Sequence, residues 1–416
     1  MIPFMQAEVN NIKANKEKIV AFPQMGNIRI PVAAVLKAMG ANLYLSPENN
    51  KEALSLGTRH STETVCLPYK LNLGNYIQAL EGGANVLLMF SAPGTCRLGN
   101  YAKMAEAKLR ELGYDFEFIV FDMYKGKFVE IIKKFSQATG NKSISNAYRG
   151  IKIGLAKFDA LDEIERKLFY FRPREIESGK AEKIYLSGRC SIEKADTVEE
   201  VKNTVQETIN KYNSVKIDTN KEILKVYLMG EFFVLLDPFT NMNIEKELGL
   251  LGVEVERTIM LSDWTNQTLI PKWNKKTETH RQRAVRTANK YLTRSVGGEC
   301  IETVGDAVYA AECNVDGVVH VGPFNCIPEI VSQCILPNVS KQENIPVISL
   351  LMDEQTGKAG MVTRIEAFVD LIRRQRKNKS IINAYNKLSL RGEAKASTWQ
   401  SKSSDCRVKS VVGNNN

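Results

Sequence analysis

The chain has 416 residues, of which 44% are hydrophobic and 25% are charged. Because a single core stops growing well below this length, two domains of about 150 to 200 residues are expected. The composition is that of an ordinary globular protein and indicates neither intrinsic disorder nor a membrane protein. No run of about 18 apolar residues occurs, and the N-terminus lacks the apolar core of a signal peptide, so a cytoplasmic location is expected.

The formal net charge of +10 is concentrated at the C-terminal end. From Leu371 onward the chain carries eleven Lys and Arg and only two acidic residues, a net charge of +9, so the rest is nearly neutral. This predicts a solvated helix end and a disordered basic tail over residues 391–416. Docking of an acidic or phosphate-bearing partner is the alternative. No basic motif with interleaved aromatics occurs, so neither nucleic acid nor a membrane is an expected partner.

Strand and helix signals alternate over residues 1–123, which predicts an N-terminal α/β lobe with a parallel sheet. KIVAFP, ANLYLS, NVLLMF and FEFIVFD are typical of strands, with helices at IPVAAVLKAMG, after Cys66 and at YAKMAEAKLRELG. The nearly continuous apolar run NVLLMF fits a sheet covered on both faces. Gly40 and Gly113 stand where helix C-caps are expected.

Residues 124–221 are predicted to be mostly helical and to join or brace two lobes. Helical segments are KFVEIIKKFSQATG, the stretch 142–170 and DTVEEVKNTVQETINKY. Thr197 and Glu200 form an expected capping box at the start of the last helix.

The alternating pattern resumes over residues 222–390 and predicts a second α/β lobe. Its strands are ILKVYLMG, VEVERTIML, GVVHV and IPVISLL, and its helices are MNIEKELGLLG, 280–292, 302–312, the segment after Cys326 and 361–376. Together the two lobes predict an α/β fold of two Rossmann-like doubly wound units with parallel sheets.

Three cysteines share a local construction that suggests one site. Cys96 and Cys326 follow an apolar strand signal and a short Gly/Pro loop, and a helix signal follows Cys66, Cys96 and Cys326 alike. Each thiol is therefore expected at a helix N-terminus, where the helix dipole favours the metal-binding thiolate. Pro68 and Pro328 suit the first helical turn. Three converging thiolates would hold a [4Fe–4S] cluster with one open iron.

The other cysteines are weaker candidates. No C-x-x-C pair occurs, so spacing alone matches no standard metal motif. Cys334 lies two helical turns beyond Cys326 and would reach only a second cluster, as in a double-cubane arrangement. The preceding residues SGR and GGE favour loops at Cys190 and Cys300, and either would be a possible ligand. Cys313 in AVYAAEC favours core packing, and Cys406 in the tail is incidental.

Two further residues are weak catalytic candidates. Glu329 lies three residues after Cys326, where it would orient a ligand, move a proton or simply face the helix dipole. His320 lies on a predicted buried strand, as a proton source or a hydrogen-bonded core residue. The segment DEQTGKAG at 353–360 either cradles an anion or forms a capping turn.

Several segments resemble the iron–sulfur subunits of the 2-hydroxyacyl-CoA dehydratase family, especially the activase-associated branch that includes double-cubane cluster proteins. The resemblance spans about residues 18–376. Its carriers are LYLSPENNKEALSLGTRHSTETVCLPYKLNLGN, GTCRLGNY, YLMGEFFVLLDPFTNMNIEKEL and the long segment from VDGVVHVGPFNCIPEI to RIEAFVDLI. The resemblance implies that Cys66, Cys96 and Cys326 bind the cluster.

The same resemblance implies an ATP-hydrolysing iron–sulfur activase as partner, which passes a low-potential electron to this chain. The sequence has no G-x-x-x-x-G-K-[ST] loop and is not expected to hydrolyse ATP itself. The substrate would be an acyl-CoA, dehydrated through a ketyl radical, or a small molecule that is reduced. A homodimer or a related second subunit is expected.

Two alternatives remain open from the sequence. The chain would be a non-catalytic electron-transfer or scaffold subunit, or a relative without a cluster whose cysteines pack or bind zinc.

Overall fold

The structure is a computed structural model that describes residues 17–91, 96–122, 128–140, 143–262, 278–379 and 381. The chain divides into two compact units, residues 1–366 and 367–416. All described strands belong to the first unit, and residues 358–379 are helical. Within the described ranges, no helix is both long and apolar enough to cross a membrane. The predicted basic tail and Cys406 lie outside the described residues.

The first sheet has four parallel strands in the order β2-β1-β3-β4. Its central strand β3 pairs with β4 from Val86↔Glu117 to Ser91↔Asp122. The bounds of its strands are β1 Ile19–Ala21, β2 Asn42–Leu43, β3 Val86–Ser91 and β4 Glu117–Asp122. The helices around it are α2 Arg29–Ala38, α3 Lys51–Arg59, α4 Leu67–Glu81, α5 Leu98–Glu111 and α6 Phe128–Thr139.

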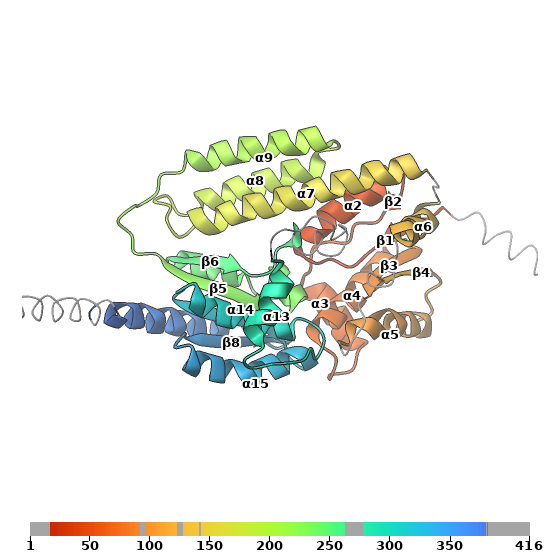
Figure 1. Ribbon diagram of the computed structural model, residues 1–416. Coiled ribbons are helices and arrows are strands. Elements are labelled where there is room, and N and C mark those ends of the chain that lie inside the picture. Colours follow the sequence, from red (N-terminus) through yellow and green to blue (C-terminus); the bar gives the residue numbers. More distant parts are fainter. Residues whose placement is uncertain are drawn as a thin grey trace, which may run out of the picture. The chain divides into compact units, whose positions relative to one another are not determined.

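Helices cover both faces of this sheet, as the apolar strand β3 predicts (Figure 1). On one face, Leu87 and Met89 pack with Tyr76 of α4 and Leu109 of α5. On the other, Leu88 packs with residues of α2 and α6.

Predicted glycine caps end the helices of this lobe. Gly40 and Gly113 follow α2 and α5 with φ values of +78° and +90°, a conformation that glycine adopts without strain.

The second sheet repeats the topology of the first, with the parallel order β6-β5-β7-β8. α14 and α15 cover one face of this sheet, where Val304 and Leu336 pack on Val318 of β7. The bounds of its strands are β5 Leu224–Gly230, β6 Val253–Arg257, β7 Gly317–Pro323 and β8 Val347–Met352. Its helices are α10 Phe232–Leu236, α11 Ile244–Leu250, α13 His280–Ala288, α14 Cys300–Glu312 and α15 Ile327–Gln342. The α/β class with two Rossmann-like lobes is therefore confirmed.

Three long helices that come between the two sheets in the sequence run side by side: α7 Ile144–Phe171, α8 Lys180–Lys194 and α9 Val198–Asn213 (Figure 1). They share a core that includes Leu161, Ile192 and Tyr212. Thr197 accepts a hydrogen bond from the Glu200 amide at 3.2 Å, as the predicted capping box requires. The Glu200 carboxylate, however, accepts from the Asp196 amide rather than from that of Thr197, so the predicted capping box is only half formed.

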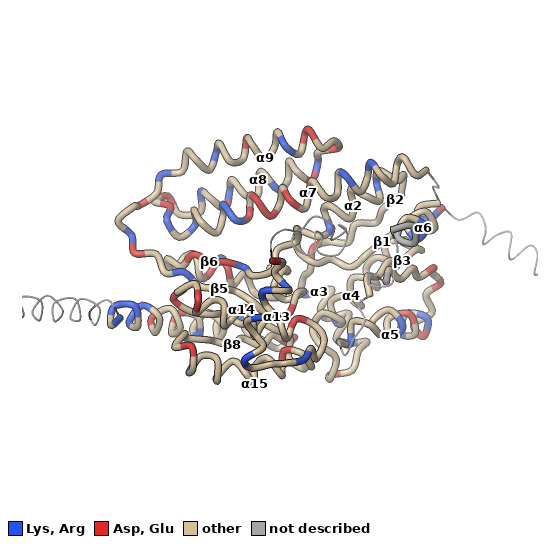
Figure 2. The backbone as a smooth tube through the Cα atoms, viewed as in Figure 1, with Lys and Arg blue, Asp and Glu red and all other residues tan. Residues whose placement is uncertain are grey.

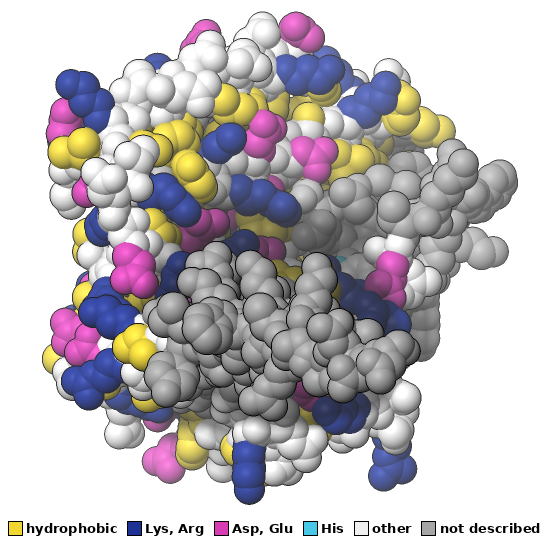
Figure 3. Space-filling model, turned by 60° about the vertical axis from the view of Figure 1, so that its left-hand side comes forward, with side chains coloured by type: hydrophobic (Ala, Val, Ile, Leu, Met, Phe, Trp, Pro, Cys, Tyr) yellow, Lys and Arg dark blue, Asp and Glu magenta, His cyan; other side chains and the backbone are white. Residues whose placement is uncertain are grey.

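Charged side chains of both signs alternate along the outer helices α8 and α9, whereas β3 carries none (Figure 2). On the face drawn in Figure 3, Lys and Arg are likewise intermingled with Asp and Glu outside the grey residues. This mixed pattern fits a solvated surface rather than a one-sign binding face.

Candidate functional site

The three predicted ligand cysteines lie where chain segments begin a helix. Cys66 is the N-cap of α4 and Cys326 is the N-cap of α15, each with Pro in the first helical turn. Cys96 lies one residue before Arg97, the N-cap of α5. Thus the sequence prediction of helix N-termini agrees with the geometry at two positions and is one residue off at Cys96.

Backbone amides of these first turns face the sulfurs. The Cys66, Cys96 and Cys326 sulfurs are hydrogen-bonded by the backbone amides of Tyr69, Leu98 and Glu329, respectively, and each of these bonds favours the thiolate. The helix N-terminus adds a positive partial charge in the same direction. These are the contacts that would stabilise a metal-bound thiolate.

The sheet topology explains why residues from two lobes meet. In open α/β sheets, ligands bind at the carboxyl ends of strands where the strand order reverses. In the second sheet this point lies between β5 and β7, and Glu231 and Cys326 follow these two strands. In the first sheet it lies between β1 and β3, and Cys96 follows β3.

The three thiols share one electrostatic environment. The charge of an ionised Cys66 raises the pKa values of Cys96 and Cys326, and the charge of Glu231 raises the pKa values of all three thiols. Burial raises the pKa of the Cys66 thiol, and it raises the pKa of Cys96 to about 12. Burial, followed by the charges of Glu231 and Glu329, also raises the pKa of Cys326. Burial therefore favours the neutral thiol at all three cysteines.

Two carboxyl groups that the sequence did not single out as site residues belong to this environment. Burial raises the pKa of Glu231 to about 7, against the hydrogen bonds that the Val234 and Phe233 amides donate to it. Burial and the charges of Glu231 and Glu329 raise the pKa of Glu299 well above its ordinary value. The sequence signal that could have identified Glu231 is its position after strand β5, which corresponds to that of Cys326 after β7.

The weak catalytic candidates His320 and Glu329 are partners. His320 Nε2 lies 2.8 Å from Glu329 Oε2, and His320 Nδ1 lies 3.0 Å from Ser349 Oγ. Both side chains are 0% exposed. The Thr303 hydroxyl donates to the other Glu329 oxygen at 3.3 Å. The pair ties the first turn of α15, which follows Cys326, to strands β7 and β8.

Tyr101 is a further contact of Cys66 that the sequence did not single out. Its hydroxyl hydrogen-bonds the Cys66 sulfur, and its ring packs edge-to-face on Tyr69 with centroids 5.1 Å apart. Arg97 donates to the carbonyl of Thr64, which ties the Cys96 segment to the segment before Cys66.

Three of the expectations about the other cysteines are wrong. Cys190 is not in a loop but lies exposed inside α8. Cys300 is not in a loop either: it is the buried first residue of α14, and it is hydrogen-bonded to Ser332. Cys313 is exposed at the C-cap of α14 rather than packed in the core. Cys334 is exposed on α15.

Close contacts link the two halves of the first unit near the thiols. Asp237 accepts from the Gly26 amide at 3.1 Å and from Asn49 at 3.0 Å. Lys70 of α4 pairs with Glu354 at 2.6 Å. In DEQTGKAG, Asp353 accepts hydrogen bonds from the Gln355 amide and the Thr356 hydroxyl, which close a turn ahead of the helix that begins at residue 358.

Among the described residues, no group of three or more His, Cys, Asp or Glu side chains is placed so that it could hold a metal ion.

The 2-hydroxyglutaryl-CoA dehydratase D-component family matches residues 32–372, which is most of the chain. No curated protein matches it. The matched range includes both sheets except β1, and it includes Cys66, Cys96 and Cys326. The chain therefore belongs to the family of the 2-hydroxyglutaryl-CoA dehydratase D-component.

Proposed function

We propose that this chain is an iron–sulfur subunit of the 2-hydroxyacyl-CoA dehydratase type, with Cys66, Cys96 and Cys326 as ligands of one [4Fe–4S] cluster. The observation that carries the proposal is the shared environment of the three thiols. They come from separate segments of two sheets, yet they act on one another electrostatically and each meets the amides of a helix start.

The residues present fit such a cluster. Three thiols and the carboxyls of Glu231 and Glu299 all have raised pKa values, with burial as the first cause. Among the main causes of these pKa shifts, the one basic side chain is Arg97, which lowers the pKa of Cys66. Bound iron would supply the missing positive charge and release the thiol protons, as metal binding to cysteines does.

The cluster would supply a low-potential electron at an iron that no protein side chain ligates. The chain's own residues hold and shield this position. The amides of Tyr69, Leu98 and Glu329 hold the three sulfurs, and the buried His320–Glu329 pair fixes the first turn of α15. Glu231, with a pKa of about 7, is able to hold or release a proton near neutral pH beside the thiols.

The partners follow from the same assignment. The chain has no phosphate-binding loop of its own, so an ATP-hydrolysing iron–sulfur activase would provide the electron. The substrate would be an acyl-CoA that is dehydrated, or a small molecule that is reduced, with a second copy or a related subunit completing the enzyme. A double-cubane arrangement would require further cysteine ligands. The two candidates are less suited to this role, because Cys334 is exposed and Cys300 is hydrogen-bonded to Ser332.

The first test is chemical analysis of protein purified without oxygen. About four irons and four sulfides per chain are expected, with visible absorption that a Cys326→Ala variant largely loses, because three thiolates hold the cubane. Cys313→Ala is the matched control, since this exposed cysteine lies outside the site, and it should keep the iron.

Each other result has a defined meaning. About eight irons would favour a double-cubane protein. Loss of iron in both variants alike would remove Cys326 from its assigned role. No iron or sulfide after anaerobic reconstitution would overturn the proposal and leave a scaffold or a relative without a cluster. A full cluster with no turnover alongside an activase would favour an electron-transfer subunit.

A further inference from the structure

The first turn of α15, which begins at Cys326, is held by a buried hydrogen-bond network around Glu329. His320 Nε2 lies 2.8 Å from one Glu329 carboxyl oxygen, and the Thr303 hydroxyl donates to the other at 3.3 Å. Ser349 Oγ lies 3.0 Å from His320 Nδ1. Strand β7, helix α14 and strand β8 contribute His320, Thr303 and Ser349, so three elements fix one side chain.

The second sheet places His320 and Ser349 for these contacts. They are directly opposite each other in the pairing of β7 with β8, so their side chains leave the same face of the sheet. A Glu329 carboxylate only accepts hydrogen bonds, so a neutral His320 ring donates from Nε2 and accepts from the Ser349 hydroxyl at Nδ1. The two neighbours of the ring therefore set both its orientation and its tautomer.

Two glycines leave room for this turn. A Cβ at Gly322 of β7 would lie 3.3 Å from both Cβ and Cγ of Glu329. A Cβ at Gly298 would lie 2.7 Å from Cγ of Pro328, the second residue of α15. The turn therefore packs closely against two glycines, which leaves little space for the Glu329 side chain to take another position.

The two ends of Glu329 act on the Cys326 sulfur in opposite directions. Its backbone amide donates a hydrogen bond to the sulfur and favours the thiolate, whereas the charge of its carboxylate raises the pKa of the Cys326 thiol. His320 and Thr303 engage one carboxylate oxygen each. A rotation that turned the carboxylate elsewhere would break both of these bonds.

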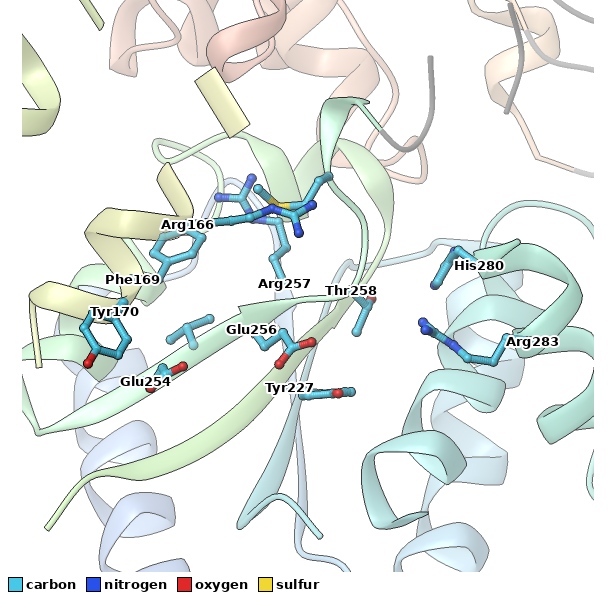
Figure 4. Close-up of a pocket in the computed structure, with 12 residues that line it drawn as sticks. Arg166, Phe169, Tyr170, Tyr227, Glu254, Glu256, Arg257, Thr258, His280 and Arg283 are labelled. Carbon is cyan, nitrogen blue, oxygen red and sulfur yellow. The ribbon is translucent and has the colours of Figure 1, made fainter. Parts of the chain in front are cut away.

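The network is closed to water. His320 and Glu329 are 0% exposed, and Thr303 is 2% exposed. A pocket of about 410 Å³ beside strand β6 is lined by other residues, among them Tyr227 and Glu254, and by none of these three (Figure 4). Because a group that exchanges protons with a substrate must reach it, this burial favours a holding role for His320 over a role as proton source.

We propose that His320 is a positioning residue for Cys326, which with Thr303 holds the Glu329 carboxylate so that the Glu329 amide meets the Cys326 sulfur. This inference rests on the proposed function, in which that sulfur binds the cluster. It adds that the hydrogen bond from the amide to the sulfur, and with it the reduction potential of the cluster, is controlled from strand β7.

The first test needs no cluster. Hydrogen exchange of the full metal-free chain, followed by mass spectrometry over residues 324–330, reports how firmly the Glu329 amide is held. His320→Leu removes the donor, so exchange there should be about tenfold faster, the factor for one hydrogen bond to a charged group. His320→Gln keeps a donor near the Nε2 position and should restore slow exchange. His320→Asn reaches only toward Ser349 and should not.

Val318→Ala is the control for this experiment. Val318 is 0% exposed, lies two residues before His320 on the same face of β7, and packs with residues of α14 and α15. The substitution removes packing from the same strand but no hydrogen bond of the network. Exchange over residues 324–330 should therefore stay close to that of the unsubstituted chain.

The second test uses protein loaded with the cluster without oxygen. His320→Leu frees the Glu329 carboxylate and weakens the bond from its amide to the sulfur, so the midpoint potential in a redox titration should fall while the iron is retained. His320→Gln should keep the potential of the unsubstituted protein. A purely structural role would not give this rescue.

The proposal is overturned if His320→Leu leaves exchange and potential unchanged, or if Val318→Ala reproduces its effects. Should His320→Leu not fold, the comparison of His320→Gln with His320→Asn decides, and equal exchange in these two variants would contradict the assigned role. Absence of iron from the unsubstituted chain would overturn the proposed function instead. In that case the exchange of the metal-free chain still shows whether His320 holds Glu329.

Discussion

Cys66 and Cys326 are buried and Cys96 is half-buried, all three near other acidic groups, and this sets their chemistry. An isolated buried thiol would stay protonated and inert, because burial disfavours the charged form. Here the amides of three helix starts work in the opposite direction and favour the thiolate. Crowded acids with raised pKa values are typical of functional sites rather than of structural cores.

Tyr101→Phe tests how finely the Cys66 sulfur is controlled. The Tyr101 hydroxyl is its one side-chain hydrogen-bond partner among the described residues. Hydrogen bonds to cluster sulfurs stabilise the reduced state, so we expect the variant to lower the midpoint potential by on the order of 50 mV. The measurement is an anaerobic redox titration followed by visible absorption.

Tyr69→Phe is the matched control for that titration. Tyr69 is as buried as Tyr101, and the two rings pack against each other. The Tyr69 hydroxyl, however, does not hydrogen-bond the Cys66 sulfur. An equal shift in both variants would mean that the potential responds to local packing rather than to the hydrogen bond. An unchanged potential in Tyr101→Phe would remove Tyr101 from the site.

Helix α4, which begins at Cys66, is positioned by its close packing with α3. Each helix contributes a glycine to the contact. A Cβ at Gly57 would lie 1.6 Å from the Lys70 carbonyl oxygen, and a Cβ at Gly74 would lie 1.8 Å from that of Ala53. Since both obstacles are backbone atoms, no side-chain rotation relieves the overlap, and the glycines set the distance between the helices.

Gly74→Ala is therefore expected to destabilise the protein by about 3 kcal/mol, although alanine ordinarily favours a helix. The measurement is the free energy of unfolding by urea. Gly360→Ala is the control, because Gly360 is helical and a Cβ there would meet nothing within 4 Å. It should leave stability unchanged or raise it by up to about 1 kcal/mol. Similar losses in both variants would contradict the packing argument.

The helices show which local signals in the sequence are reliable. The pair Gly297 and Gly298 does form a turn with positive φ values, but α14 begins at Cys300 immediately after it. At Cys190 the glycine signal has another cause, because Gly188 lets α8 approach α9, where a Cβ would lie 2.7 Å from Thr208. A glycine that opens a turn and one that admits a neighbouring helix are alike in a single sequence.

For the molecule as a whole, apolar periodicity was sufficient to predict two parallel α/β sheets, because buried strands and their covering helices have distinct patterns. The pairing of His320 with Glu329 and the roles of Glu231 and Glu299 were not predictable. His320 and Glu329 are only nine residues apart, but they lie on β7 and on the helix α15 that follows it, whereas Glu231 and Glu299 come from other segments of the chain. The family resemblance identified the three cysteines, but their shared environment is a property of the three-dimensional structure.

One ion pair tests how the two halves of the first unit are joined near the thiols. Lys70 lies on α4 and is 1% exposed, while Glu354 follows β8 and its side chain is 20% exposed. The pair is therefore asymmetric, since Glu354 reaches water without Lys70, but Lys70 without Glu354 is a buried charge.

Glu354→Gln should consequently cost about 3–5 kcal/mol of unfolding free energy, the usual penalty for leaving one partner of a buried pair uncompensated. Lys70→Met keeps most of the buried hydrocarbon and should cost only about 1 kcal/mol. The double variant should then be more stable than Glu354→Gln alone, because the buried charge is gone. Denaturant unfolding of all four proteins gives the coupling energy. If Lys70→Met is the more damaging single change, the lysine is needed for more than charge balance, and its other contact, the carbonyl of Glu63 at 3.4 Å within the same half, matters more than the ion pair.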